Sequence, residues 1–288
     1  MAEGIQRDFL DSQVLSRLSG LSLHARIPML GNVSGRHRSP IRGSSLEFAE
    51  YRKYVPGDDT RRLDWRAWGR SDRFYIKEFE ADTNLRLCFV VDTSGSMNFP
   101  EGGPLTKLEY AKRIAGHLAF LASHQGDAVG LYCANDSFQK EIPPKRSPAH
   151  LGIVYDELEG VEGKGATGLA AALHGAAEKI SQRALIIVLS DFFVDPAELK
   201  EAFQHLRFRK HDVAAFHLLE RQEVDFEFER PTRFVDLENG PAILADPELI
   251  RLRYQRAMDG YLEEISDLMR DAAIDYHRVI LEEPYDEV

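Results

Sequence analysis

The fold is decided by residues 85–96, whose sequence is LRLCFVVDTSGS. Residues 85–91 are apolar except for Arg86, which is typical of a strand buried on both faces of a sheet. The strand ends directly in Asp92, Ser94 and Ser96, which form an Asp-x-Ser-x-Ser sequence. In open α/β sheets, ligands bind beyond the carboxyl ends of the strands, so these three polar side chains are expected at a binding edge.

Helix-like and strand-like segments alternate along the chain after this strand. Apolar residues recur at helical spacing between short apolar runs that are typical of strands. The expected helices cover residues 106–124, 148–158, 168–181, 197–206 and 247–273, and the expected strands cover 127–134, 184–190, 212–219 and 275–281. Strands joined through long helices form parallel βαβ units whose sheet is covered on both faces. We therefore predict an α/β fold with a doubly wound, mostly parallel sheet.

Two β-rich segments, residues 46–79 and 224–245, depart from this alternation. The second contains strand-like pieces at 225–229, 233–236 and 242–244, separated by turn signals. Neither segment is large enough to bury a core alone, so we predict that they pair into one small discontinuous β subdomain. The expected domains are residues 1–84, with an N-terminal helix at 8–22 and a β-rich segment, and residues 85–288, with the β insertion at 224–245.

The composition narrows the classes of partner and compartment. The chain has 288 residues and a formal net charge of −11, which repels phosphate backbones and argues against nucleic acid as a partner. The N-terminal residues are polar and charged, unlike a signal peptide, and no apolar run approaches the ~20 residues that span a bilayer. Cys88 and Cys133 lie in apolar runs and are expected to be buried thiols. We expect a cytoplasmic protein without membrane insertion.

Oxygen-bearing side chains follow three segments that end at the same predicted sheet edge. Asp92, Ser94 and Ser96 follow the first strand, Thr167 lies in a glycine-rich loop before a helix, and Asp191 follows the strand at 184–190. Carboxylate and hydroxyl oxygens suit Mg²⁺ or Mn²⁺ and suit zinc poorly. Each piece alone can also be a helix cap or a turn. Together they predict one divalent-cation site with a position open to water or to an acidic side chain of another molecule.

These five residues resemble the metal-ion-dependent adhesion site of von Willebrand A domains. The motif of that family is Asp-x-Ser-x-Ser, then a Thr and then an Asp, and all five positions match here. The resemblance implies a von Willebrand A-like, Rossmann-like fold. It also implies that Asp92, Ser94, Ser96, Thr167 and Asp191 hold the metal, some of them through water, and leave a position for a partner's carboxylate.

A narrower resemblance covers nearly the whole chain. Residues 42–59 (RGSSLEFAEYRKYVPGDD), 61–65 (RRLDW) and 75–80 (YIKEFE) resemble the bacterial domain-of-unknown-function family fifty-eight. Members often occur beside MoxR-type AAA+ ATPases and are thought to act as metal-dependent adaptors in protein maturation or complex assembly. The resemblance therefore implies a MoxR-type ATPase as partner. Residues 51–73, rich in Arg, Asp and Trp, are open to two interpretations, a salt-bridged turn or a partner surface.

The motifs favour a binding protein over an enzyme. A phosphotransferase that used Asp92 as nucleophile would need a second acid two residues later, where Ser94 stands. The sequence around Ser94 lacks the Gly-x-Ser-x-Gly pattern of serine hydrolases, and Gly163-Lys164 lacks the other residues of a phosphate-binding loop. We therefore expect a metal-dependent protein-interaction adaptor and no enzyme. The alternatives are a metal-dependent hydrolase or phosphotransferase, and a metal-free scaffold.

Overall fold

The computed structural model describes residues 7–18, 20–21, 23, 42–53, 68–69, 74–80, 85–100, 103, 105–136, 138–238 and 240–285. The chain divides into two compact units. One contains Met1–Leu23 and Arg86–Val288, and the other contains His24–Leu85. The second unit carries β1 (Arg42–Lys53) and β2 (Tyr75–Glu80), which form a two-stranded antiparallel sheet. Residues 54–67 and 70–73, which hold most of the Arg- and Asp-rich segment, lie outside the described residues.

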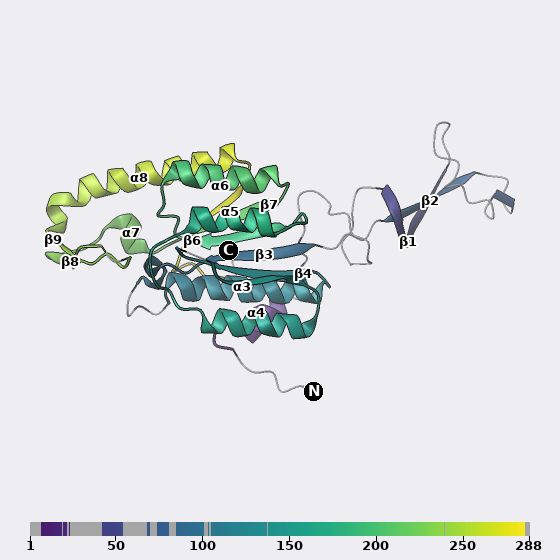
Figure 1. Ribbon diagram of the computed structural model, residues 1–288, viewed down its shortest axis with the longest axis horizontal. Coiled ribbons are helices and arrows are strands. Elements are labelled where there is room, and N and C mark those ends of the chain that lie inside the picture. The colour runs from purple at the N-terminus through teal and green to yellow at the C-terminus, as the bar shows by residue number, and fades with distance from the viewer. Residues whose placement is uncertain are drawn as a thin grey trace. The chain divides into compact units, whose positions relative to one another are not determined.

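Six strands of the first unit form one sheet in the order β10-β7-β6-β3-β4-β5 (Figure 1). The strands are β3 (Arg86–Asp92), β4 (Ala128–Ala134), β5 (Phe138–Lys145), β6 (Leu185–Ser190), β7 (Asp212–Leu219) and β10 (Asp275–Ile280). All neighbours pair in parallel except β5, which pairs antiparallel with β4. The predicted doubly wound, mostly parallel sheet is therefore confirmed. The sequence analysis missed β5, because its Pro143-Pro144 and charged residues resemble a loop and suit only an edge strand.

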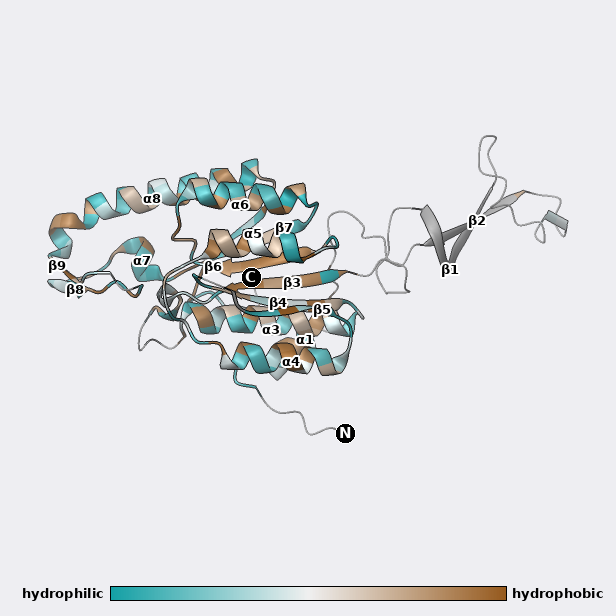
Figure 2. Ribbon diagram, in the orientation of Figure 1, coloured by the Kyte–Doolittle hydropathy of each residue, from teal (hydrophilic) through white to brown (hydrophobic). Residues whose placement is uncertain are grey.

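Helices cover both faces of this sheet. Figure 1 shows α5 (Leu169–Lys179), α6 (Pro196–Phe208) and α8 (Pro247–Asp271) on one face, with α3 (Lys107–His124) and α4 (Pro148–Gly160) on the other. Along β3, the odd-numbered Leu87, Phe89 and Val91 belong to the core beneath α3 and α4, whereas Cys88 and Val90 belong to the core beneath α5 and α6. Figure 2 shows these strands as hydrophobic between partly hydrophilic helices. Successive strand residues point to opposite faces, so a strand with both faces covered must be apolar throughout.

The N-terminal helix α1 (Ser12–Leu18) packs against the first unit, whereas the sequence analysis grouped it with residues up to 84. Phe9 is buried and meets the Tyr155 ring edge-to-face, with 5.8 Å between ring centroids. The Asp11 N–H donates to His117 Nε2 at 3.0 Å. A short helix gains its stability from such packing and not from its own length. The compact unit therefore begins before the segment 24–85 and resumes after it.

The insertion between β7 and α8 differs from its prediction. The strand expected at 225–229 is wrong: the capping box of Glu220 and Glu223 starts α7 (Arg221–Asp225), and Phe226 ends this helix in the left-handed region at φ 52°. The insertion then forms a two-stranded hairpin of β8 (Thr232–Phe234) and β9 (Ile243–Ala245).

Each β-rich segment forms its own hairpin among the described residues, β1 with β2 in one unit and β8 with β9 in the other. The predicted β subdomain shared by the two segments stays a prediction. Within its own unit the insertion packs on α8, since Phe226 stacks on Tyr254 with centroids 4.2 Å apart, and Phe234 stacks on Phe226 at 5.5 Å. Aromatic packing on a long helix thus holds the insertion to the first unit.

Candidate functional site

The Asp-x-Ser-x-Ser loop lies at the carboxyl end of β3, between β6 and β4. Asp92 Oδ1 accepts the Ser94 N–H at 2.9 Å, which turns the chain immediately after the strand. The Ser94 and Ser96 hydroxyl oxygens are 3.0 Å apart. Asp92 and Ser94 are fully buried, whereas Ser96 is partly exposed. The loop therefore places one carboxylate and two hydroxyls side by side at the edge where open α/β sheets bind ligands.

The glycine-rich loop joins this edge through backbone hydrogen bonds. The Gly95 N–H donates to the Gly165 carbonyl at 2.9 Å, and the Lys164 N–H donates to the Thr93 carbonyl at 2.8 Å. At Gly168 a Cβ would lie 1.9 Å from the Asn135 carbonyl oxygen, so only glycine permits the loop to pack on the end of β4. As a result, the Thr167 hydroxyl lies 3.5 Å from Asp92 Oδ2.

β6 adds a hydroxyl that the sequence analysis missed. The Ser190 hydroxyl donates to Asp92 Oδ2 at 2.7 Å, so both oxygens of this carboxylate accept hydrogen bonds. Burial, and then the neighbouring charge of Asp191, raise the pKa of Asp92 to about 6. Ser190 stands directly before the predicted ligand Asp191 and has the residue type of the other hydroxyls, which is the signal that could have identified it.

Asp191 is buried beside Asp92, but its nearest charge comes from a residue that the sequence analysis did not consider. Lys107 is fully buried, and its ammonium lies 2.8 Å from Asp191 Oδ2 and 2.6 Å from Glu223 Oε1. Burial acts to lower the pKa of Lys107, but the two carboxylates outweigh burial and raise it. The carboxylates of Asp92, Asp191 and Glu223 carry three negative charges, and the Lys107 ammonium carries one positive charge. The remaining two negative charges are what a divalent cation neutralises.

The five predicted residues are therefore not equivalent. Asp92, Ser94, Ser96 and Thr167 contact one another through the distances above, whereas Asp191 joins them through its charge and through Ser190. The donors are hard oxygens, as Mg²⁺ and Mn²⁺ prefer. Within the part of the chain that the structure describes, no group of three or more His, Cys, Asp or Glu side chains could hold a metal ion. A cation here would depend on hydroxyl ligands, and the donor set fits one that also keeps water ligands.

The insertion reaches the same site. The Thr167 N–H donates to Glu238 Oε2 at 3.0 Å. At Gly95 a Cβ would lie 2.0 Å from the Leu237 carbonyl oxygen. The insertion can therefore touch the Asp-x-Ser-x-Ser loop at this residue only because glycine has no side chain. Figure 1 shows α7, β8 and β9 at the end of the sheet toward which β3 runs. The sequence analysis did not connect this insertion with the site, so Glu238 was not among the candidates.

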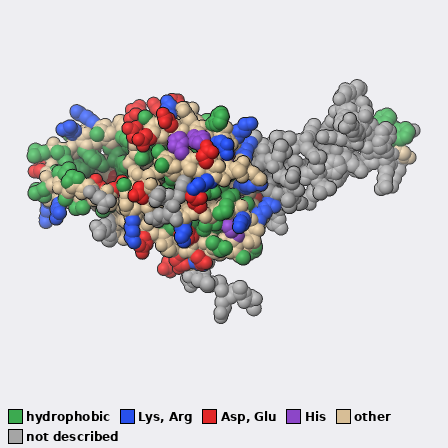
Figure 3. All heavy atoms as spheres, in the orientation of Figure 1, with side chains coloured by type: hydrophobic (Ala, Val, Ile, Leu, Met, Phe, Trp, Pro, Cys, Tyr) green, Lys and Arg blue, Asp and Glu red, His purple; other side chains and the backbone are tan. Residues whose placement is uncertain are grey.

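An apolar hollow lies between the insertion and the site. It has a volume of about 430 Å³ and shares Ser96 with the candidate metal ligands. Aromatic side chains of Phe99, Phe226, Phe234 and Tyr254 line it. Figure 3 shows hydrophobic side chains gathered at this end of the unit, over β8, β9 and the start of α8. Five of these are at least half exposed, namely Val235, Ile243, Leu244, Leu249 and Leu252. Exposed apolar clusters of this kind mark protein interaction surfaces.

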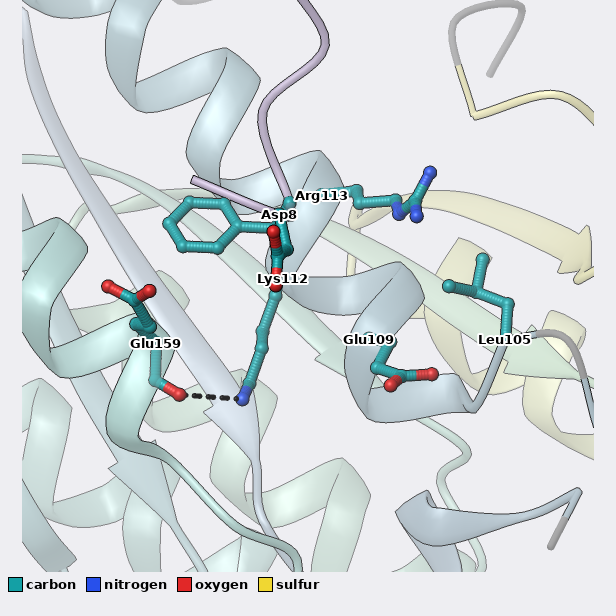
Figure 4. Close-up of a pocket in the computed structure, with 7 residues that line it drawn as sticks. Asp8, Leu105, Glu109, Lys112, Arg113 and Glu159 are labelled. Carbon is teal, nitrogen blue, oxygen red and sulfur yellow. Dashed lines mark hydrogen bonds between the residues drawn. The ribbon is translucent and has the colours of Figure 1, made fainter. Parts of the chain in front are cut away.

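A second hollow, of about 240 Å³, lies between the N-terminal segment and helices α3 and α4. Figure 4 shows its charged lining, in which Lys112 points to the backbone carbonyl of Glu159 at 3.3 Å. The same ammonium donates to the Val161 carbonyl at 2.6 Å. This lysine therefore ties α3 to the end of α4, and the hollow has the character of a helix junction.

The alternative of a serine hydrolase finds no support in the contacts of the loop. Among the hydrogen bonds of the described residues, none joins a histidine to Ser94 or Ser96, which a serine nucleophile would need for activation. Among the helices of the described residues, none is long and apolar enough to cross a membrane.

Comparison with known proteins agrees with this fold. A family described as "Protein of unknown function DUF58" matches residues 50–261. Uncharacterized proteins of Mycobacterium tuberculosis and Mycobacterium bovis are 26% identical over 275 residues, which cover 92% of this chain and 84% of each relative.

Three of the solved structures with a similar fold are compared in turn. An aerotolerance-related membrane protein from Bacteroides fragilis is 19% identical, with a TM-score of 0.50 over 71% of this chain and 94% of that one. BatB from Bacteroides thetaiotaomicron is 20% identical, with a TM-score of 0.46 over 68% and 91%. The VWA domain of SpRpn10 is 9% identical, with a TM-score of 0.42 over 71% and 92%. Together with the strand order, the similarity to the Bacteroides fragilis chain supports an α/β fold with a mostly parallel sheet. Since the family match covers well over half of its residues, the chain belongs to the DUF58 family of proteins of unknown function.

Proposed function

We propose that this protein binds a protein partner through a divalent cation, Mg²⁺ or Mn²⁺, held by Asp92, Ser94, Ser96, Thr167 and Asp191. The observation that carries the proposal is the environment of Asp92. This carboxylate is fully buried, accepts hydrogen bonds from the Ser94 N–H and the Ser190 hydroxyl, and lies 3.5 Å from the Thr167 hydroxyl. Burial, and then the neighbouring charge of Asp191, raise its pKa to about 6. Such a group is stabilised by a bound cation.

The role of the cation in binding follows from the charges. The negative charges of two aspartates balance the charge of a divalent ion. The hydroxyl ligands are neutral and reduce the charge on the ion little further. The ion therefore stays attractive to an incoming Glu or Asp of a partner. The chain has a formal net charge of −11, which would repel that carboxylate without the ion. The cation supplies a local positive point on an acidic protein.

The partner that we propose is a MoxR-type AAA+ ATPase or its client, in the assembly or maturation of protein complexes in the cytoplasm. This rests on the membership in the DUF58 family and on what the resemblance implies. The apolar hollow next to Ser96 supports a protein over a small ion as the ligand, because protein interfaces combine apolar area with a few polar contacts. We propose a binding role without catalysis.

The test is surface-plasmon binding of the purified protein to the MoxR-type ATPase of the same organism, with Mg²⁺ and with excess EDTA. We expect binding only with Mg²⁺, and loss of binding in Ser94→Ala, Ser96→Ala and Thr167→Ala. Ser181→Ala changes an exposed serine after α5 and serves as the matched control, which should bind as the wild type does.

Two outcomes would favour the alternatives. Equal affinity in Mg²⁺ and EDTA removes the cation from the mechanism and leaves the metal-free scaffold. Metal-dependent turnover of a phosphate or ester substrate, abolished by Asp92→Ala, favours the hydrolase or phosphotransferase.

A further inference from the structure

The outer face of α8 separates its charges along the helix. The inner face is formed by buried side chains such as Met258, Leu262 and Ile265, whereas the outer face is exposed to solvent. Figure 3 shows basic side chains near the start of α8 and a group of acidic side chains farther along its course. In chain order the outer face consists of leucines, arginines, small residues and then acids, namely Leu249, Leu252, Arg253, Arg256, Ala257, Gly260, Glu263, Glu264 and Asp267. The two halves of this face therefore carry opposite charges.

The helix itself offers these charges few partners. Opposite charges four residues apart stabilise a helix, and like charges at that spacing destabilise it. The acids Asp259, Glu263 and Asp267 follow one another at this spacing, and the residue four positions after each arginine is a small one. Asp267 pairs with the exposed Arg270 at 2.6 Å, but among the ion pairs of the described residues none includes Glu263 or either arginine. The arrangement therefore suits pairing with a second helix better than pairing within α8.

A second copy of α8, placed antiparallel, carries the complementary charges. If the twofold axis passes beside Gly260, positions equally far before and after this glycine lie opposite each other in the two copies. Arg253 lies seven residues before Gly260 and Asp267 seven residues after it, so these two come together across the axis. Arg256 lies four residues before the glycine and Glu263 three after it, so they come together as well. Each pair forms twice, because both copies contribute the same surface to a twofold interface.

Gly260 itself fits a position at the axis. It lies within α8, where glycine lowers the stability of a helix relative to alanine. A Cβ at this position would meet nothing within 4 Å, so the packing of the single chain does not require glycine here. Between two helices, the absence of a side chain allows the backbones to approach closely. The dimer therefore gives this glycine a role that the single chain does not.

We propose that this protein forms a symmetric dimer in which the outer face of α8 packs antiparallel on the same face of a second copy. The ion pairs set the register of the two helices. Leu249 and Leu252, which are 83% and 70% exposed, add apolar area toward both ends of the interface. The formal net charge of −11 on each chain opposes the association of two copies, so the dimer depends on this local complementarity. The interface contains none of the candidate metal ligands and is independent of the proposed function.

Sedimentation velocity of the full chain in EDTA, over a series of protein concentrations, tests the dimer. The dissociation constant should rise between about 50 mM and about 500 mM NaCl, because salt screens exposed ion pairs. Arg256→Glu should raise it about tenfold, since attraction becomes repulsion at two symmetric places. Adding Glu263→Arg to this variant should recover dimerisation, because the swapped charges pair again. The matched control is Lys145→Glu, which makes the same charge change on an exposed residue of β5 and should dimerise as the wild type does.

Gly260→Leu is a second test, which changes no charge. The added side chain has open space in the single chain, so thermal denaturation should show a monomer at least as stable as the wild type, whereas dimerisation should be lost. Loss of the dimer in Gly260→Leu, together with its recovery in the charge-swapped variant, supports the proposal. A wild type that stays monomeric at about 100 µM protein overturns it. A dimer that survives both Arg256→Glu and Gly260→Leu forms through another surface and also overturns it.

Discussion

Lys107 is the residue on which the charge balance of the site depends. It is the first residue of α3, between Thr106 and Glu109 of the capping box, and its side chain is fully buried between Asp191 and Glu223. A buried ion pair adds little net stability over apolar residues, but removal of one partner leaves an uncompensated charge. The ammonium is therefore a cation that is built into the site beside Asp191.

We expect Lys107→Met to destabilise the metal-free protein by about 3–5 kcal/mol, because the buried Asp191 and the partly buried Glu223 lose their counter-charge. Urea denaturation in EDTA measures this, and Lys200→Met, on an exposed lysine of α6, is the control. Addition of Glu223→Gln to the Lys107→Met variant should recover part of the loss, since one of the two unpaired charges is removed. A loss below about 1 kcal/mol in the single variant would show that the pair is solvated.

Asp92→Asn should stabilise the metal-free protein. The folded pKa of about 6 exceeds the ordinary value of 3.8, so the folded state resists ionisation of this group. The wild type therefore loses stability as the pH rises from about 4 to about 6, by about 1–3 kcal/mol, and the variant avoids this loss.

The response to Mg²⁺ separates the wild type from this variant. The wild type should gain about 2.7 kcal/mol at an ion concentration 100 times the Kd, whereas Asp92→Asn should gain nothing. Thermal denaturation at pH 7.5 with and without Mg²⁺ measures both effects. Equal stabilisation of the two proteins by Mg²⁺ would contradict the assignment of Asp92 as a ligand.

At the scale of elements, the amino end of β7 shows how helix α6 is attached to the sheet. His211 is buried there, and its Nδ1 accepts the Ala184 N–H at 3.2 Å. The next residue, Asp212, accepts from Arg183 at 2.8 Å and from Arg207 at 3.3 Å. Burial, followed by the nearby charge of Arg209, lowers the pKa of His211 to about 4. The junction therefore favours the neutral form of the His211 imidazole.

This junction predicts a loss of stability in acid. The unfolded histidine titrates near 6.5 and the folded one near 4, so the unfolded state binds more protons between these values. Stability is complete above about pH 6.5 and falls as the pH decreases toward 4, by up to about 3 kcal/mol from this residue. In His211→Asn, which keeps an acceptor for Ala184, urea denaturation should show a smaller decline, whereas His124→Asn, on an exposed histidine, should follow the wild type. An identical decline in all three proteins would exclude His211 as the cause.

At the scale of the whole molecule, the candidate site lies at one end of the first unit. The insertion lies at the end toward which β3 runs (Figure 1), and hydrophobic side chains gather there (Figure 3). Lys107 reaches the same end through its contact with Asp191, which follows β6. The β3–β6 pair is the switch point of the sheet, because the chain leaves β3 for β4 on one side and later returns to β6 on the other. Loops diverge at such a point and leave a crevice between them.

The acidity of the whole chain gives a simple prediction about partners. A formal net charge of −11 repels polyphosphates, so double-stranded DNA should not bind at micromolar concentrations of protein and 150 mM salt. A gel-shift titration measures this, with a basic DNA-binding protein as positive control. A shift that disappears at higher salt would reveal a local basic surface that outweighs the overall charge.

The sequence by itself determined the sheet and its five parallel strands, β3, β4, β6, β7 and β10. Runs such as Ala184–Ser190 can be stable only between two layers of helices, and the position of Asp92, Ser94 and Ser96 directly after such a run places them at the sheet edge whatever the loops do. Local pattern also predicted Thr167, which lies in a glycine-rich loop just before α5, and Asp191, which directly follows β6.

Only the tertiary structure decided the surroundings of these residues. Lys107, Glu223 and Glu238 come from α3, α7 and the insertion, and nothing in their local sequence distinguishes them from surface charges. The packing of the insertion on α8, where Phe226 stacks on Tyr254, likewise depends on a contact with a residue farther along the chain. The periodicity of apolar residues predicts which face of a helix or strand is buried. The partner of a buried or half-buried charge depends on which distant elements meet, and tertiary packing decides which elements meet.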